Sequence, residues 1–235
     1  MTILKHLRLP SPCSYHRAST IQEHLVALHH TAKHAATSKP PPPLLLTAEF
    51  NPVYTLGRRE RDNLPSATLT QLLASNNAEL VTTNRGGQIT FHGPGQLVAY
   101  LVLDLKRHKL TPRCYIRFLE TSVIDALKHF GLEAYTTENP GVWVSDQRKI
   151  TAVGVRMQRY ITSHGVGLNV NTDQEWWRHI VACGLQGKEM TSMAQEGVQV
   201  DVAGVEGVFT RIVADGLKLK AVENVNEEEV LNWTA

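Results

Sequence analysis

Cys183 is the residue of this sequence best placed for nucleophilic chemistry. It stands in the stretch VACGLQGKEMTS, directly before Gly184 and between two predicted elements. A free cysteine is most often a small buried apolar residue, but in a loop before a glycine it is well placed to act as a nucleophile. A thiol reacts faster when a neighbouring cation favours its thiolate form. A positively charged side chain beside Cys183 would therefore favour this chemistry.

Lys149 stands at the start of the segment RKITAVGVRM. If this segment is a strand, Ala152 and Gly154 share one face and leave a trough there, because their side chains are small. Lys149 opens the strand, so its amine can reach over the rim of that trough. A solvated lysine at a strand end is the ordinary alternative.

The stretch from Arg85 to Gln96, RGGQITFHGPGQ, holds four glycines. Glycines at this density allow left-handed backbone or the close approach of another group. Phosphate-binding loops need their glycines between a strand and a helix, but the segment that follows, QLVAYLVLDL, has the composition of a strand. We interpret the stretch as a loop that walls a narrow pocket, with Arg85 as its anchor. His92 is available for a hydrogen bond, although a purely structural role is favoured for it.

A third glycine-marked segment, SHGVGLNV, places Gly165 and Gly167 on either side of Val166. Two glycine-bearing strands that are adjacent in sequence, this one and the strand after Lys149, are predicted to form opposite walls of one slot. Lys188, in GLQGKE, lacks the Ser or Thr that would follow it in a phosphate-binding loop.

The elements that must position these residues can be read from periodicity and turn residues. An amphipathic helix is predicted from Ala18 onward, and PPPP at residues 40–43 is a rigid connector inside the domain. Thr111 and Pro112 mark the start of a helix that ends at Gly131. Further short helices are predicted near 173–180 and 208–220. Strands are predicted at 44–50, 53–56, 79–83, 88–91, 96–105, 141–145, 149–158 and 160–170.

Because strands come in runs and do not alternate with helices, the sequence predicts an α+β fold with a large mixed or antiparallel sheet flanked by helices. All of it belongs to a single predicted domain over residues 1–235.

Composition narrows the class of protein. The chain has 235 residues, of which 42% are hydrophobic and 20% charged, and no apolar run is long enough to span a membrane. Its three cysteines have no CxxC spacing, which argues against a disulfide scaffold and a zinc knuckle. Residues 1–117 carry 14 Lys and Arg against 6 Asp and Glu (+8), and the rest carry 10 against 16 (−6), which sums to the net charge of +2. A basic face for an acidic protein partner and an interleaved, cancelling arrangement both remain open.

Taken together, RGGQITFHGPGQLVAY, RKITAVGVR, TSHGVGLNV and ACGLQGKEMTS resemble the lipoyl(octanoyl) transferases. The resemblance runs in order from about Leu7 to Met193. It implies a fold related to the biotin and lipoate protein ligases, and an enzyme that moves an octanoyl group from acyl carrier protein to a lysine of lipoyl domains. The chain departs from the family pattern at Phe91, Gly167 and Ala182, where tyrosine, alanine and proline are usual. These departures leave acyl chain-length selectivity open.

The resemblance also implies roles for individual residues. Cys183 carries the acyl group as a thioester, and Lys149 lowers the pKa of its thiol. The implied substrate-binding residues are Arg85, Gly86, Gly87, Gln88, Ile89, Thr90, Phe91, His92, Ala152, Val153, Gly154, Gly165, Val166 and Gly167. For the mechanism we further expect backbone N–H groups near Gly184, or in the loop of Gly86 and Gly87, to hold the oxyanion, and Lys149 to serve as general base toward the acceptor lysine.

No metal, nucleotide or redox cofactor is expected, and neither nucleic acid nor a membrane is an expected partner. The expected donor is octanoyl-acyl carrier protein, and the expected acceptors are lipoyl domains of 2-oxoacid dehydrogenase and glycine cleavage complexes. The acid-poor N-terminus, with Glu23 as the single acid of the first 48 residues, favours mitochondria over the cytoplasm. Three alternatives remain: an ATP-dependent lipoate or octanoate ligase, a non-catalytic acyl-binding protein, and a zinc site built from His29, His30 and His34 with a cysteine.

Overall fold

The computed structural model describes residues 3–35, 39–60, 72, 78–180 and 187–234. Cys183 and its neighbours 181–186 lie outside the described residues.

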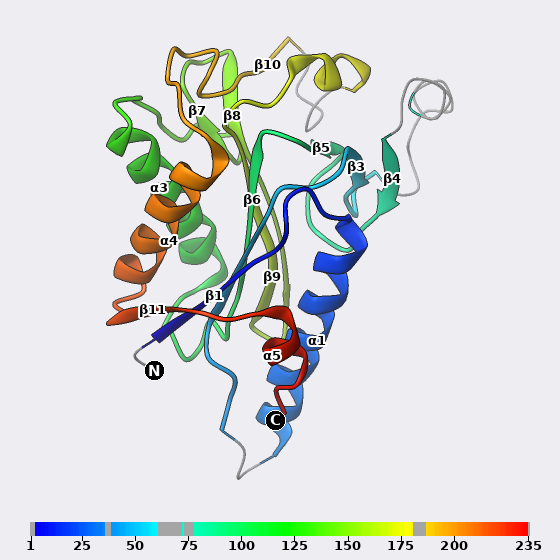
Figure 1. Ribbon diagram of the computed structural model, residues 1–235, viewed down its shortest axis with the longest axis vertical. Coiled ribbons are helices and arrows are strands. Elements are labelled where there is room, and N and C mark those ends of the chain that lie inside the picture. The colour runs from blue at the N-terminus through cyan, green and yellow to red at the C-terminus, as the bar shows by residue number, and fades with distance from the viewer. Residues whose placement is uncertain (1–2, 36–38, 61–71, 73–77, 181–186, 235) are drawn as a thin grey trace.

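One large sheet forms the middle layer of the molecule (Figure 1). Its strands follow the order β10-β8-β9-β6-β2-β1-β11, with β7 paired to β8. The β2–β6, β6–β9 and β8–β9 pairs are antiparallel, whereas β1 pairs in parallel with both β2 and β11, so the sheet is mixed. The strands span Ile3–Arg8 (β1), Leu44–Ala48 (β2), Gln96–Val102 (β6), Val142–Trp143 (β7), Arg148–Gln158 (β8), Ile161–Asn169 (β9), Glu189–Met190 (β10) and Ala221–Asn224 (β11). A second sheet, in the order β4-β3-β5, contains Val53–Leu56 (β3), Glu79–Thr82 (β4) and Thr90–His92 (β5).

Helices cover both faces of the large sheet. Helices α3 (Pro112–His129) and α4 (Val202–Gly216) lie on one face, and α1 (Tyr15–His34) lies on the other, joined there by the short α5 (Glu227–Leu231). Strand β6 shows why: Leu97, Ala99 and Leu101 alternate with apolar residues of the opposite face, so every residue of the strand is buried. A strand buried on both faces needs a layer of helices on each side. The α+β class and the mixed sheet are confirmed.

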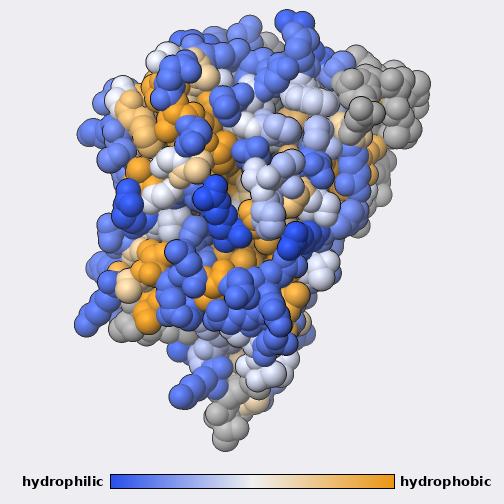
Figure 2. All heavy atoms as spheres, in the orientation of Figure 1, coloured by the Kyte–Doolittle hydropathy of each residue, from blue (hydrophilic) through white to orange (hydrophobic). Residues whose placement is uncertain are grey.

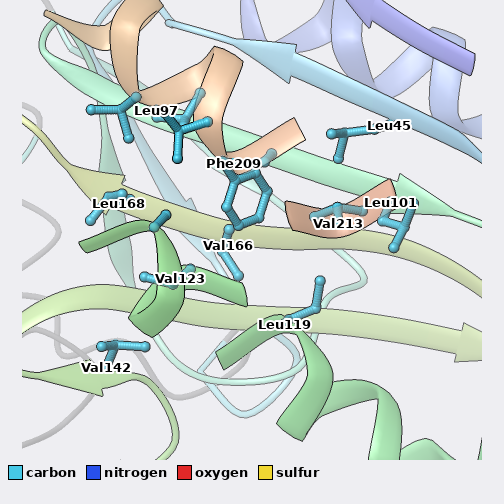
Figure 3. Packing of buried hydrophobic residues seen from close by; sticks show 14 of the residues in the cluster. Leu45, Leu97, Leu101, Leu119, Val123, Val142, Val166, Leu168, Phe209 and Val213 are labelled. Carbon is cyan, nitrogen blue, oxygen red and sulfur yellow. The ribbon is translucent and has the colours of Figure 1, made fainter. Parts of the chain in front are cut away.

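The core between the sheet and helices α3 and α4 is shown in Figure 3. Phe209 and Val213 of α4 and Leu119 of α3 point toward Leu101 and Val166 of the sheet. On the outside, hydrophilic residues cover much of the face seen in Figure 2, with hydrophobic residues visible between them. In the part of the chain that the structure describes, no helix combines the length and apolar character needed to cross a membrane.

Local signals set the helix boundaries. The Thr111 side chain accepts a hydrogen bond from Cys114 N–H, and Pro112 follows at the first helical position, as predicted. Helix α4 begins at Val202, where Asp201 caps it, and ends at Gly216. The helix predicted near 208–220 therefore begins and ends earlier in the chain than predicted. Strands β1 and β11 were not predicted. The β1–β11 pair joins residues more than two hundred positions apart, such as Ile3 and Ala221, and no local sequence pattern predicts such a pairing.

Candidate active site

Strands β8 and β9 form a patch of sheet with almost no side chains. In their antiparallel pairing Ala152 lies opposite Gly167, and Gly154 lies opposite Gly165. Cross-strand partners point to the same face, so the four residues make one smooth floor. The prediction that these strands are opposite walls was wrong. They are joined by a tight turn at Arg159 and Tyr160, which places them side by side in one sheet.

Neighbouring atoms fill or crowd the space that side chains would occupy at the three glycines of this floor. A Cβ on Gly165 would overlap the carbonyl oxygen of Ala99 in β6. A Cβ on Gly154 would lie 3.0 Å from Cδ of Arg85, and one on Gly167 would lie 2.9 Å from Oε1 of Gln96. The glycines therefore allow the loop of Arg85 to approach the floor closely.

Arg85 fastens this loop to strand β3. It is buried, and its Nη2 donates to the carbonyl oxygen of Thr55 at 2.6 Å and to the Thr55 hydroxyl at 2.8 Å. Gly86 N–H donates to the carbonyl oxygen of Val155 at 3.0 Å, which ties the loop to β8 as well. Gly87 has a φ of +87°, a conformation that favours glycine. The anchoring role predicted for Arg85 agrees with these contacts.

His92 belongs to a chain of hydrogen bonds that ends at the strand of Lys149. The Gln96 side chain donates through Nε2 to Asn169 Oδ1 at 2.9 Å, so its Oε1 accepts from His92 Nδ1, at 2.6 Å. Asn169 Nδ2 donates to the Thr191 carbonyl at 2.9 Å, and Thr191 N–H donates to the Lys149 carbonyl at 2.9 Å. Burial lowers the pKa of His92 to about 4, so its imidazole is neutral at neutral pH.

Lys149 is buried, with only 3% of its surface exposed, although a lysine near a strand end is usually solvated. Its Nζ lies 5.5 Å from the centre of the Trp143 ring, within the range of a cation–π contact. Its aliphatic stem passes against Gly141, where any side chain would overlap Cε of the lysine. The fold therefore encloses this amine.

A cavity of about 300 Å³ brings the predicted residues together. This volume is at the lower end of the range for small-molecule sites. Twelve predicted binding residues and Lys149 line it; the twelve are Arg85, Gly86, Gly87, Gln88, Thr90, His92, Ala152, Val153, Gly154, Gly165, Val166 and Gly167. Sequence reasoning did not find six further lining residues, which are Arg59, Tyr100, Ile116, Asn139, Pro140 and Val155. Of these, only the Asn139–Pro140–Gly141 turn carries a local sequence signal.

The two other predicted binding residues, Ile89 and Phe91, do not line the cavity and are buried in a neighbouring apolar cluster. Phe91 stacks on Trp176 with ring centres 4.9 Å apart. Trp176 belongs to the 3₁₀ helix η1 (Gln174–His179), and Tyr54 donates to its carbonyl oxygen at 2.6 Å. Phe91 therefore holds the segment that leads toward Cys183.

Cys183 itself, with Ala182 and Gly184, lies outside the described residues, so the structure does not place it. Both described flanks are fixed. Ile180 packs in the cluster of Phe91, and Met190 of β10 pairs with Lys149 of β8.

The chain was compared with known proteins. Residues 15–214 match the model of the lipoyl protein ligase A/B catalytic domain. A probable octanoyltransferase of Schizosaccharomyces pombe is 45% identical over 197 residues, which cover 83% of this chain and 87% of the relative. A mitochondrial octanoyl-(acyl-carrier-protein):protein N-octanoyltransferase of Danio rerio is 46% identical over 183 residues, 78% of each chain.

Solved structures show similarity in fold alone. A lipoate-protein ligase A bound with ATP superposes with a TM-score of 0.70 at 14% identity, over 98% of this chain and 92% of that one. A putative lipoate protein ligase from T. acidophilum gives a TM-score of 0.68, also at 14% identity, with the same coverage.

Proposed function

The chain belongs to the family of the lipoyl protein ligase A/B catalytic domain, and we propose that it transfers octanoyl groups through a thioester on Cys183, activated by Lys149. It is an acyltransferase, since relatives 45% and 46% identical to it are octanoyltransferases. The donor is an octanoyl-acyl carrier protein and the acceptors are lipoyl proteins. The observation that supports the mechanism is one cavity in which a smooth glycine floor meets a buried lysine.

The floor suits an unbranched acyl chain. Ala152, Gly154, Gly165 and Gly167 present backbone and one methyl group, so methylene groups can lie flat against the sheet. Each buried methylene contributes about 0.8 kcal/mol, which gives an eight-carbon chain several kcal/mol of binding.

Acyl transfer from a carrier thioester proceeds most readily to another thiolate, because the bond broken and the bond formed are of the same kind. This favours Cys183 as the acceptor of the first half-reaction. A free thiol with a pKa of about 8.5 is only a few per cent ionised at neutral pH, and a cation beside it raises that fraction. Lys149 is the proposed cation, and the pairing of Met190 with Lys149 supports it, because the chain returns from Cys183 to the strand that carries the lysine.

In the first step the Cys183 thiolate attacks the thioester carbonyl. As the tetrahedral intermediate collapses, the carrier sulfur leaves as a thiolate and takes a proton from the Lys149 ammonium group, which leaves the Lys149 amine neutral. Gly86 N–H is already bonded to the Val155 carbonyl, so we assign the oxyanion to the N–H groups of Gly87 and Gly184 instead of Gly86.

In the second step the acceptor lysine attacks the acyl-enzyme and must be neutral to do so. A free lysine has a pKa of about 10.4 and is mostly protonated at neutral pH. Lys149, enclosed in the same cavity and left neutral by the first step, is the proposed base that receives the proton and becomes an ammonium group again. The Cys183 thiolate leaves, and the octanoyl group remains on the acceptor as an amide.

For the acceptors and the location we propose the lipoyl domains of 2-oxoacid dehydrogenase and glycine cleavage complexes, in mitochondria. The relatives from Danio rerio, Arabidopsis thaliana and Saccharomyces cerevisiae are named mitochondrial, which supports this location. Import of the tagged full-length chain tests it, and a purely cytosolic signal would overturn it.

The rival activity is that of an ATP-dependent ligase, because solved structures of the same fold are lipoate protein ligases. The test offers the purified chain a lipoyl domain with either octanoyl-carrier protein alone or free octanoate plus ATP. We expect the acceptor to gain an octanoyl group only in the first mixture. Modification only in the second mixture would show that the chain is an ATP-dependent ligase and not a transferase.

A further inference from the structure

The stem of Lys149 occupies a space that exists only because residue 141 is glycine. A Cβ on Gly141 would overlap Cε of Lys149 and would lie 3.0 Å from its Nζ and 2.5 Å from the Thr151 carbonyl oxygen. The φ of Gly141 is +126°, which other residues rarely adopt. The position of the Gly141 backbone therefore sets the path of the lysine.

Glu120 holds that backbone in place. It lies on α3, one turn after the cavity residue Ile116, and is only 7% exposed. Its Oε1 accepts a hydrogen bond from Gly141 N–H at 2.9 Å. Among the described residues no Lys, Arg or His lies within ion-pair distance of Glu120.

A buried carboxyl group without an ion pair costs stability unless its hydrogen bonds compensate. An apolar side chain at this position of α3 would be buried with a smaller loss of folding stability than the carboxyl group of Glu120. The contact with Gly141 is therefore a reason for Glu120 at this position.

Trp143, two residues after Gly141, also lies beside the lysine. Trp143 Nε1 donates to the Asn139 carbonyl at 3.2 Å, and the backbone of Trp143 exchanges two hydrogen bonds with Tyr135. The Lys149 amine thus lies close to both Gly141 and the Trp143 ring.

We propose that Glu120 is a positioning residue, which fixes the Lys149 amine in the acyl cavity by holding Gly141. Glu120 does not line the cavity and acts through the loop alone. This inference rests on the function proposed for Lys149.

The test compares Glu120→Leu, which removes the acceptor, with Glu120→Gln, which keeps an oxygen acceptor in a side chain of the same length. Transfer from octanoyl-carrier protein to a lipoyl domain is measured for both, for wild type and for Lys149→Met, together with thermal unfolding. We expect Glu120→Leu to lower kcat by about a hundredfold with little change in KM, because small misplacements of a reacting group cost rate of this order. Glu120→Gln should stay within about threefold of wild type, since its Oε1 still accepts from Gly141.

The pH profile separates positioning from a purely structural role. With the lysine displaced, the limb of the kcat/KM profile that reports thiol ionisation should move to higher pH in Glu120→Leu and stay in place in Glu120→Gln. If Glu120→Leu does not fold, Glu120→Asp replaces it, because its shorter side chain draws the oxygen away from Gly141, and it should lower kcat in the same way.

Wild-type kcat in Glu120→Leu or Glu120→Asp would overturn the proposal, as would an unmoved pH limb or a loss in Glu120→Gln equal to that in Glu120→Leu. Full activity of Lys149→Met would instead refute the function proposed for the lysine, so the two failures are distinguishable.

Discussion

Met190 lies beside Lys149 in the large sheet, where β10 and β8 run parallel and the two residues are register partners. Thr191, the next residue, donates its N–H to the Lys149 carbonyl at 2.9 Å. The described strand that follows the segment of Cys183 therefore runs directly beside the buried lysine. On the other flank, Ile180 is held in the aromatic cluster of Phe91 and Trp176. The register partner of the lysine thus lies seven positions after Cys183 in the sequence.

Replacing Lys149 by Met should lower octanoyl transfer by at least about a hundredfold, because the thiol loses the cation that favours its thiolate form. The pH dependence of alkylation of Cys183 by iodoacetamide measures this directly. The apparent pKa of the thiol should rise in the variant. An alkylation profile identical to that of wild type would remove Lys149 from this role.

Replacing Gly154 by Ala should shorten the acyl chain that the enzyme prefers. The new methyl group would stand on the cavity floor 3.0 Å from Arg85 Cδ, so the Arg85 side chain must move by a few tenths of an ångström to accommodate it. Loss of contact for one methylene corresponds to about 0.8 kcal/mol, so kcat/KM for octanoyl donors should fall about fourfold or more relative to hexanoyl donors.

The matched control for this variant is Gly207→Ala in helix α4, where a new Cβ meets no atom within 4 Å. It should stabilise the fold by about 0.5–1 kcal/mol and leave chain-length preference unchanged. An unchanged preference in Gly154→Ala would contradict the placement of the acyl chain on this floor.

Acid should destabilise the fold through buried histidines. Burial lowers the pKa of His29 and His92 to about 4 and that of His164 to about 3, whereas an unfolded histidine titrates near 6.5. Their neutral forms stabilise the fold fully above about pH 6.5, and this stability is lost as pH falls from there toward 4. The loss approaches about 1.4 kcal/mol per pH unit for each histidine.

Urea unfolding at pH 7.5, 6 and 5 measures this loss. His29→Leu is the matched variant, because His29 lies on α1 and does not line the acyl cavity. Between pH 6 and 5, the variant should show a smaller slope of the unfolding free energy against pH. The difference is the contribution of one proton, about 1.4 kcal/mol per pH unit at most. A slope equal to that of wild type would show that His29 does not titrate in this way.

Local chemistry explains which parts of this molecule were predictable. Thr111 and Pro112 fix the start of α3 by themselves, and the glycine pattern of β8 and β9 identified the residues of the floor. The burial of Lys149 was not predictable, because it depends on Gly141 and Trp143, which reach it through the fold. The same holds for Ile116 and Tyr100, ordinary apolar positions whose place in the cavity depends on how α3 and β6 pack.

The central claim is that Cys183 carries the octanoyl group. The direct measurement is the intact mass of the chain after mixing with octanoyl-carrier protein in the absence of acceptor, followed by peptide mapping. The account predicts a gain of one octanoyl unit, mapped to Cys183 and absent from Cys183→Ala, which should also lose transfer to the lipoyl domain. Full transfer by Cys183→Ala, or an octanoyl unit on another residue, would contradict the account.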